Sequence, residues 1–452
     1  MSTLAPRLGQ AARQWGWLLL LALAPVYLAA NPRLAPALLA LPALLAAMVV
    51  GASSSSRRTP LDWPILLLML MVLVSLWATF SIVYSLPKIT GLLFGVGLYY
   101  AWVARGRQSL RALAGLTALH LAFGVALAGV GLLGINWSAK IPILTALTAR
   151  LPAMNFSLPG AENGLSPNGV AGVLLWVAPP ACALSAAAWL NFGRLVRAHG
   201  RAAATTAALL LTFVALGATA VLVLSQSRGA LLGLAVALGL IPLVTLWNAL
   251  WPRPSAAQPI QRPRYLTLVA LVFTAAILLG CALLAVWFVA AAGDPASVDP
   301  WGSLGARFVI WPRAIQAIQD FPFTGVGLDA FRRLVNTLYP IFNLSPDIDI
   351  AHAHNTWLQV ALDVGLPGLV AYLAMWIVTL VMLFQTLRRA AHPGLRALAL
   401  GLLGALAGAF VYGLTDTIAL GSRPGFMWWT LLALATLVWI RSRLDLNPGA
   451  VV

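Results

Sequence analysis

Charged residues are scarce in this chain, and acidic residues are the scarcest of all. Of 452 residues, 9% are charged, with 11 Asp and Glu against 28 Lys and Arg, whereas 61% are hydrophobic. The mean hydropathy is +0.91. A soluble domain needs a polar surface, and roughly a quarter of its residues are ordinarily charged. The composition therefore excludes a water-soluble protein.

Cysteine is nearly missing as well. The chain has only Cys182 and Cys281, and both lie inside apolar runs. A disulfide framework or a thiolate metal site needs several cysteines at short, regular spacings. Neither is expected here.

Long apolar runs occupy most of the chain instead. A helix needs about 20 apolar residues to cross the hydrocarbon core of a bilayer, and we expect about twelve such helices. They fall near residues 15–31, 33–51, 63–81, 87–104, 111–134, 167–190, 203–224, 229–250, 265–292, 355–386, 396–416 and 426–440. The predicted fold is an all-α polytopic membrane protein in which residues 1–452 form a single membrane domain.

Two of these runs have unusual features. The run 15–31 follows Arg7 and Arg13, as in a signal peptide, but a second apolar run follows at once, so we expect a retained membrane helix. The run 355–386 is too long for one upright helix, which predicts that it tilts or begins outside the membrane.

The basic residues gather in alternate loops. If both termini lie inside, the inner loops hold 18 of the 28 basic residues but, among the acidic ones, only Asp62 and Asp445. This is the positive-inside pattern of membrane proteins. The net charge of +17 thus reflects topology and not a nucleic-acid partner, because the basic residues are spread over short loops. The inner basic residues are Arg7, Arg13, Arg57, Arg58, Arg105, Arg107, Arg111, Arg194, Arg197, Arg201, Arg253, Arg262, Arg264, Arg388, Arg389, Arg396, Arg441 and Arg443.

Two long loops then lie outside, residues 135–167 and, between the ninth and tenth helices, residues 293–355. In the second loop, apolar residues recur at helical spacing at Leu304, Phe308, Trp311, Ile315 and Ile318. We expect a short amphipathic helix on the outer surface. Arg307 would lie at the edge of its apolar stripe and Arg313 on the far side. Pro312 suits a first helical turn better than an interior, which favours a helix that starts after Arg307.

Arg228 and Arg307 are candidate functional residues of the outer side. Arg228 lies in the short polar segment Ser225–Gly229 between two apolar runs. An arginine at mid-membrane costs about 2.5–3.5 kcal/mol, and much less near the interface. Arg228 is therefore either a side chain that snorkels to water or one that a tight turn holds toward a cavity. Arg307 is either a solvated loop charge or a functional group.

His352 and His354 end the second outer loop and titrate near neutral pH. They have three interpretations: solvated loop residues, metal ligands, or a general acid or base in an outer cavity. If residues 347–354 are extended, Asp347 and Asp349 face away from the two histidines. A metal site shared by all four would then need a bend in the chain.

Three blocks between residues 225 and 370 form a family pattern. The first is Ser225-Gln226-Ser227-Arg228-Gly229-Ala230. The second is Arg307 and Trp311, followed by Pro322, Gly325, Val326, Gly327 and Phe331. The third is His354-Asn355-Thr356-Trp357-Leu358-Gln359, followed by Asp363-Val364-Gly365-Leu366. In this order, around a large outer loop, they resemble the motifs of the O-antigen ligase and polymerase superfamily. Asp363 stands where Glu is more usual, and the first 200 residues are similar only in hydrophobicity and helix number.

The resemblance implies a glycosyltransferase of the bacterial inner (cytoplasmic) membrane, with cytoplasmic termini and an active site that faces the periplasm. The donor would be a glycan on undecaprenyl diphosphate. The acceptor would be the lipid A core for an O-antigen ligase, another lipid-linked chain for a polymerase, or a protein for an O-oligosaccharyltransferase.

The resemblance also implies roles for single residues. Arg228 and Arg307 would bind the diphosphate, and His354 would act at the acceptor hydroxyl. The reaction would invert the anomeric centre without a metal or another cofactor. His352, Asn355 and Gln226 are expected supporting residues.

The chemistry of these residue types agrees with such a transfer. Arginine stays charged and binds phosphate oxygens in a fork, and a neutral histidine can accept the proton of a hydroxyl group. The rival class is a transporter, such as a flippase for lipid-linked glycans. Transporter sites lie near the bilayer midplane, but no predicted helix interior here is rich in ionisable groups.

The charge pattern predicts the orientation of the loops. A single cysteine placed at Ser297 should react with a membrane-impermeant thiol reagent added from outside, and one placed at Ser255 should not. The opposite labelling pattern would overturn the topology, and with it the outer location of the site.

Overall fold

The computed structural model describes residues 58–135, 137, 140–151, 165–250, 305–341 and 349–444. These residues form helices and their connections, together with one isolated β-bridge between Ile135 and Leu165. The all-α prediction is confirmed. The helices are α4 (Asp62–Ser75), α5 (Ile82–Gly106), α6 (Leu110–Gly134), α7 (Pro142–Thr148), α8 (Pro167–Leu174), α9 (Ala178–Leu190), α10 (Phe192–His199), α11 (Arg201–Leu224), α12 (Arg228–Leu250), α14 (Gly305–Asp320), α15 (Phe331–Leu338), α16 (Thr356–Arg389), α17 (Pro393–Gly413), the 3-10 helix η3 (Arg423–Gly425) and α18 (Phe426–Leu444).

Within the described residues, eight helical segments are long and apolar enough to cross a membrane. Each coincides with an expected span, and the expected span 63–81 corresponds to the shorter apolar helix α4. The expected spans 15–31, 33–51 and 265–292 lie outside the described residues. The total of twelve therefore stays a prediction.

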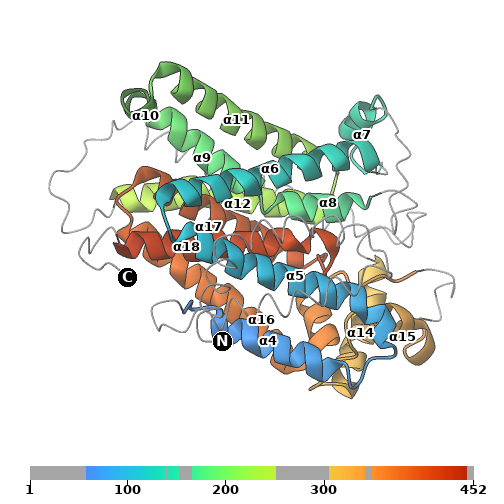
Figure 1. Ribbon diagram of the computed structural model, residues 1–452. Helices are drawn as coiled ribbons and strands as arrows, with labels where there is room; N and C mark the ends of the chain where they lie inside the picture. The colour runs from blue at the N-terminus through green and yellow to red at the C-terminus, as the bar shows by residue number, and fades with distance from the viewer. Residues whose placement is uncertain are drawn as a thin grey trace, which may run out of the picture.

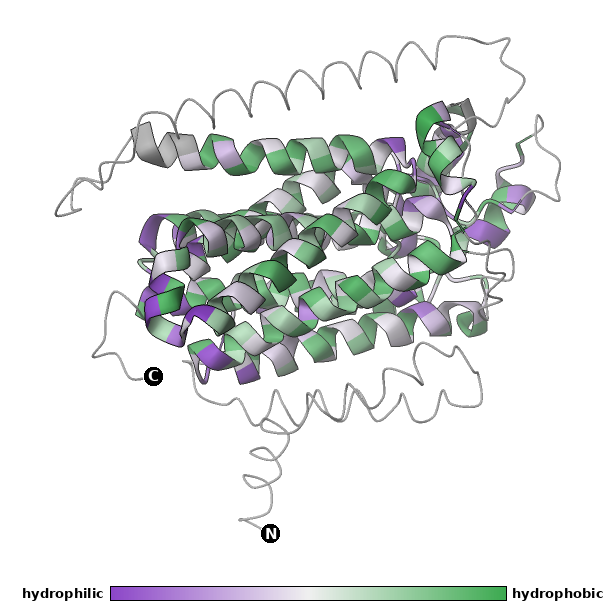
Figure 2. Cartoon of the chain, turned by 90° about the horizontal axis from the view of Figure 1, so that it is seen from above, coloured by the Kyte–Doolittle hydropathy of each residue, from purple (hydrophilic) through white to green (hydrophobic). Residues whose placement is uncertain are grey.

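The long helices run side by side and give the bundle two distinct ends. In Figure 1, α10 and the end of α18 lie at one end, and α7, α14 and α15 lie at the other, which we call the outer end after the orientation that the charge pattern predicts. Figure 2 shows hydrophobic residues along the lengths of the helices and hydrophilic residues gathered at both ends. This distribution suits a bundle whose middle part lies in the hydrocarbon of a bilayer.

Close packing between α12 and α17 sets the positions of their outer ends. Gly233 of α12 faces Gly408 of α17, and a Cβ on Gly408 would lie 2.7 Å from the backbone oxygen of Gly233. Gly404 packs in the same way against Ala237. Small residues at this spacing let two membrane helices approach closely. The start of α12 is thereby held beside the segment that follows α17.

The long helix α16 is interrupted, as its length suggested. Gly365 has φ 73°, a left-handed conformation that glycine adopts readily, and it divides an outer part from the part that continues to Arg389. At the break, Leu366 N donates to Pro322 O (2.7 Å) and Val326 N donates to Leu362 O (2.7 Å). A Cβ on Gly365 would overlap the backbone of Phe323. The glycine thus allows the turn after α14 to seat in the break of α16.

A second hydrophobic cluster lies at the outer end of the bundle, distinct from the large core shared by the membrane helices. It joins residues of α14, α15, the segment before α16 and the outer part of α16. Its buried members are Ile310, Ala314, Ala317, Val326, Ala330, Phe331, Val335, Tyr339, Ile341, Ile350, Ala353 and Leu362.

The predicted helix exists, but its predicted start was wrong. Helix α14 begins at Gly305, before Arg307, and Pro312 lies inside it. The apolar stripe is divided between two surroundings, since Phe308 is 67% exposed and Ile315 is 45% exposed, whereas Ile318 packs against the outer cluster. Arg307 and small residues such as Ala314 form the buried face, because small side chains allow close contact with the rest of the outer cluster. The exposed apolar stripe remains available to a membrane surface.

Candidate active site

The turn between α11 and α12 places Arg228. Ser225, Gln226 and Ser227 are buried, and Ser225 Oγ donates to Leu222 O (2.6 Å), which closes the last turn of α11. Gln226 has φ 55°, a left-handed conformation that is uncommon outside glycine. The reversal lets α12 begin at Arg228.

A close contact explains why glycine follows Arg228. A Cβ on Gly229 would overlap the hydroxyl group of Thr415, which follows α17. The Ser-x-Ser-Arg-Gly pattern therefore combines a sharp reversal, a basic side chain and a point of close approach to the 414–417 segment.

Arg307 reaches the same place from α14. Its side chain is 8% exposed. Its Nε donates to Thr415 O (2.5 Å), and its Nη2 lies 3.7 Å from Asp416 Oδ2. Burial lowers the pKa of Arg307 and the nearby Asp416 carboxylate opposes that shift, but a guanidinium stays charged in proteins. Arg307 is thus a buried cation held by an adjacent carboxylate.

Asp416 is the centre of this network, and the sequence analysis did not single it out. Its Oδ2 accepts a hydrogen bond from Asn168 Nδ2 (2.7 Å). Its Oδ1 accepts from Thr417 N (2.9 Å) and lies 3.3 Å from His354 Nδ1. Burial alone would raise the pKa of Asp416, but the His354 hydrogen bond and the neighbouring positive charges bring it to about 2. Asp416 therefore carries a negative charge at neutral pH.

His354 lies just before α16, in a segment held from both sides. Trp311 Nε1 donates to Ala353 O (3.0 Å), and Ala353 N donates to Gln359 Oε1 (2.8 Å). His354 has φ 48°, so His354 and Gln226 are two of three non-glycine residues with positive φ in the described chain. Such strained conformations persist where the surroundings impose them, and they cluster at functional sites.

Asn355 and His352 support this segment in different ways. Asn355 Oδ1 accepts from Trp357 N and Leu358 N (both 3.0 Å), which caps α16, and its Nδ2 donates to Leu414 O (3.0 Å). His352 Nδ1 accepts from His354 N (3.2 Å). Burial, with a contribution from His354, lowers the pKa of His352 to about 4. His352 is therefore neutral near pH 7.

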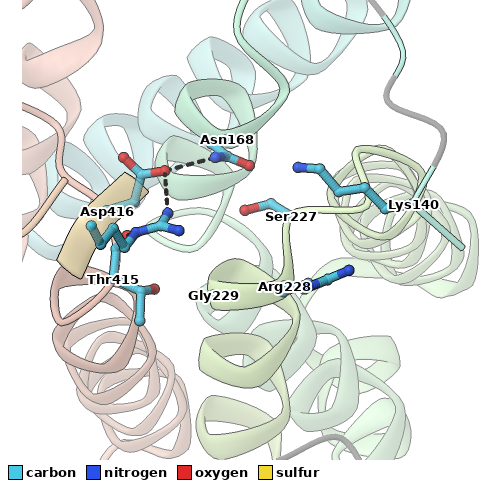
Figure 3. Close-up of a pocket in the computed structure, with 8 residues that line it drawn as sticks. Lys140, Asn168, Ser227, Arg228, Gly229, Thr415 and Asp416 are labelled. Atoms are coloured by element: carbon cyan, nitrogen blue, oxygen red, sulfur yellow. Dashed lines mark hydrogen bonds and ion pairs between the residues drawn. The ribbon is translucent and has the colours of Figure 1, made fainter. Parts of the chain in front are cut away.

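The two predicted arginines meet in one small pocket. Lys140, Asn168, Ser227, Arg228, Gly229, Arg307, Thr415 and Asp416 line it. Figure 3 shows Asp416 and Lys140 on opposite sides of the pocket, with Ser227 between them. The structure thus brings Arg228 and Arg307 to one pocket, and Asp416 connects Arg307 to His354. Asn168, Thr415 and Lys140 belong to the same site but were not predicted, since they carry no motif and lie far apart in the sequence.

The same atoms have the geometry of a metal-ion site. His352, His354 and Asp416 each offer one ligand atom, all within 4.8 Å of one another. However, both Asp416 oxygens already accept hydrogen bonds, and His352 Nδ1 accepts one from His354 N. A cation held by these atoms would have to displace donors that already satisfy a buried carboxylate. The network therefore favours a hydrogen-bonded His–Asp pair.

One family model matches part of this chain. Residues 211–373 match the family model described as O-antigen ligase. This match supports the resemblance of residues 225–370 to the O-antigen ligase superfamily. The matched segment contains Arg228, Arg307 and His354, whereas Lys140, Asn168 and Asp416 lie outside the matched residues. The match supports a membrane glycosyltransferase of the ligase and polymerase type. A search of curated proteins found no match.

The lowered pKa of His352 predicts how stability depends on pH. An ordinary histidine has a pKa of about 6.5, so the unfolded chain binds the proton more tightly than the folded chain does. Stability is thus lost as pH falls from about 6.5 toward 4. In His352→Gln, the apparent Tm should fall less between pH 7.5 and pH 4.5 than in the parent. The matched variant His199→Gln, at an exposed histidine, should behave like the parent. An equal fall of the apparent Tm in all three proteins would contradict the lowered pKa of His352.

Proposed function

We propose that this protein transfers a glycan from undecaprenyl diphosphate to an acceptor hydroxyl on the outer face of the bacterial inner membrane. The observation that carries the proposal is the position of Asp416. One buried carboxylate lies 3.7 Å from the guanidinium of Arg307 and 3.3 Å from the imidazole of His354. An anion-binding group and a proton acceptor are thereby held together at one end of an apolar bundle, which is the requirement for such a transfer.

The reaction begins with a donor that is already activated. The acceptor oxygen attacks the anomeric carbon, and the bond from that carbon to the phosphate oxygen breaks, so the diphosphate leaves with the electron pair. Arg228 and Arg307 would stabilise the charge that develops on the leaving group. Both are suited to this, because a guanidinium binds phosphate oxygens through two parallel N–H groups.

The proton of the acceptor hydroxyl goes to His354. Asp416 Oδ1 accepts a hydrogen bond from Nδ1 of His354, which assigns the proton to Nδ1 and leaves Nε2 basic. Asp416 also stabilises the imidazolium that forms. This arrangement needs no metal ion, and an attack from the side opposite the leaving group inverts the anomeric centre.

We place this protein in the ligase branch, with the lipid A core as acceptor, cytoplasmic termini and a periplasmic site. An O-antigen polymerase or a protein O-oligosaccharyltransferase would use the same geometry. A flippase for lipid-linked glycans is disfavoured, because the described site lies at one end of the bundle, whereas transporter sites lie near its middle.

The histidines provide the direct test of this function. The purified protein in detergent, given a lipid-linked donor and an acceptor, should transfer glycan without a second membrane compartment. His354→Ala should abolish transfer at unchanged expression, and His352→Ala should reduce it less, because His352 accepts only a hydrogen bond from the His354 backbone. Loss of activity with a chelator, and its restoration by zinc or magnesium, would contradict the metal-free mechanism. Normal transfer by His354→Ala would remove the proposed base.

Substitutions of three arginines distinguish a specific diphosphate site from a diffuse basic surface. A hydrogen bond to a charged group contributes roughly 1.5–3 kcal/mol, so Arg228→Ala and Arg307→Ala should each lower kcat/KM by about tenfold to over a hundredfold. Lysine at either position should restore only part of the activity, because it keeps the charge but not the fork. Arg313→Ala, on α14 but outside the pocket, should stay within a few-fold of the parent. Equal losses at positions 307 and 313 would indicate a diffuse basic surface instead of a diphosphate site.

A further inference from the structure

Gln226 connects the site to the first outer loop. Its Oε1 accepts hydrogen bonds from Lys140 N (2.9 Å) and Ile141 N (2.6 Å), and Thr145 Oγ1 lies at 3.4 Å. Two backbone N–H groups directed at one atom identify that atom as the amide oxygen. The side chain is fully buried. One amide therefore fixes the backbone at the start of α7 to the turn that carries Arg228.

Lys140, whose backbone is fixed in this way, has a basic side chain. Lys140 lines the same pocket as Arg228 and Arg307. In Figure 3 its side chain enters from the side opposite Asp416, and its amine points toward the space between Asn168 and Ser227. Burial lowers the pKa of Lys140, and the charges of Arg228 and Arg307 lower it further, whereas Asp416 raises it. Lys140 thus lies within the electrostatic reach of both arginines.

The charges around the pocket match a particular ligand. Its lining residues carry three positive charges, on Lys140, Arg228 and Arg307, and one negative charge, on Asp416. The excess of two positive charges equals the charge of a diphosphate diester, which has one negative charge on each phosphate. A lipid phosphodiester has only one negative charge and would leave one cation of the pocket without a counter-charge. Burial makes such a mismatch unfavourable.

We propose that Lys140, positioned by Gln226, is a third phosphate-binding residue and makes the pocket select a lipid donor with two phosphates over one with a single phosphate. This inference rests on the proposed function. Arg307 of α14 and Arg228 of α12 would bind the diphosphate on one side. Lys140 of the first outer loop would bind it on the other side. Gln226 is a positioning residue, since it acts only through the backbone of Lys140.

Two lipid analogues test the selectivity. The methyl esters of farnesyl diphosphate and of farnesyl phosphate, methylated on the terminal phosphate so that they carry two and one negative charges, are compared as inhibitors of glycan transfer by the purified full-length protein. The parent should be inhibited by the diphosphate at a concentration at least about tenfold lower than by the monophosphate. In Lys140→Met this ratio should fall toward one, mainly through weaker inhibition by the diphosphate. Lys140→Arg should keep most of the selectivity, because it keeps the charge.

The matched control is Arg150→Met, which removes an exposed cation from the same outer loop. Its inhibition ratio should equal that of the parent. An equal fall in Arg150→Met and Lys140→Met would mean that the loop acts only through its overall charge, and the inference would fail.

Gln226 is tested through its coupling to Lys140. Gln226→Leu should lower the inhibition ratio in the parent but have little further effect on the ratio in Lys140→Met, because the residue that it positions is already lost. Independent effects that add would indicate a general role in folding and would overturn the positioning role. If Gln226→Leu does not fold, Thr145→Val weakens the same contact at a less buried position and should lower the ratio in the parent alone.

The outcomes separate this inference from the function on which it rests. A parent protein that the methyl ester of farnesyl diphosphate does not inhibit would contradict the diphosphate site itself. A parent that selects the diphosphate and loses inhibition in Arg307→Ala, but keeps full selectivity in Lys140→Met, would contradict only the role of Lys140.

Discussion

The buried carboxylate of Asp416 is the interaction on which the outer end of this bundle depends. A buried charge is tolerated only where it is paired and hydrogen-bonded, and the partners here come from α8, α14, the segment before α16 and its own loop. Loss of any of these partners would leave the carboxylate poorly compensated, and breaking a buried ion pair costs about 3–5 kcal/mol. The same constraint that aligns four distant segments also sets the distance between the cation and the base of the proposed reaction.

The membrane architecture was predictable from one sequence, because hydropathy responds directly to the bilayer. Each of the expected spans within the described residues has a helix. The site was predictable only in part. Arg228 and Arg307 lie in local patterns, and the left-handed turn at Gln226 explains one of those patterns. Asp416 lies in a short polar interruption between two apolar runs, where an acidic residue at an outer helix end was the only available signal.

Periodicity identifies an apolar face of a helix but not what that face contacts. On α14, Phe308 of the apolar stripe stays exposed, whereas the small residues Ala314 and Ala317 are buried in the outer cluster. A helix at a membrane surface has apolar neighbours on two sides, lipid and protein, so its small residues indicate the closer contact. Pro312 lies inside α14 at an exposed position.

The two hydrophobic clusters have a consequence for how a lipid donor can enter. Arg228 and Asp416 belong to segments anchored in the large membrane core, whereas Arg307 and His354 belong to segments anchored in the smaller outer cluster. The reacting groups thus lie where the two clusters meet, and α16 joins the clusters, because its Val360 and Val364 pack in the large core while its Leu362 packs in the outer cluster. A site at this boundary, at one end of an apolar bundle, would let the proposed donor bring in its phosphates while its long hydrocarbon tail stays among apolar surroundings, so the tail need not be threaded through the protein.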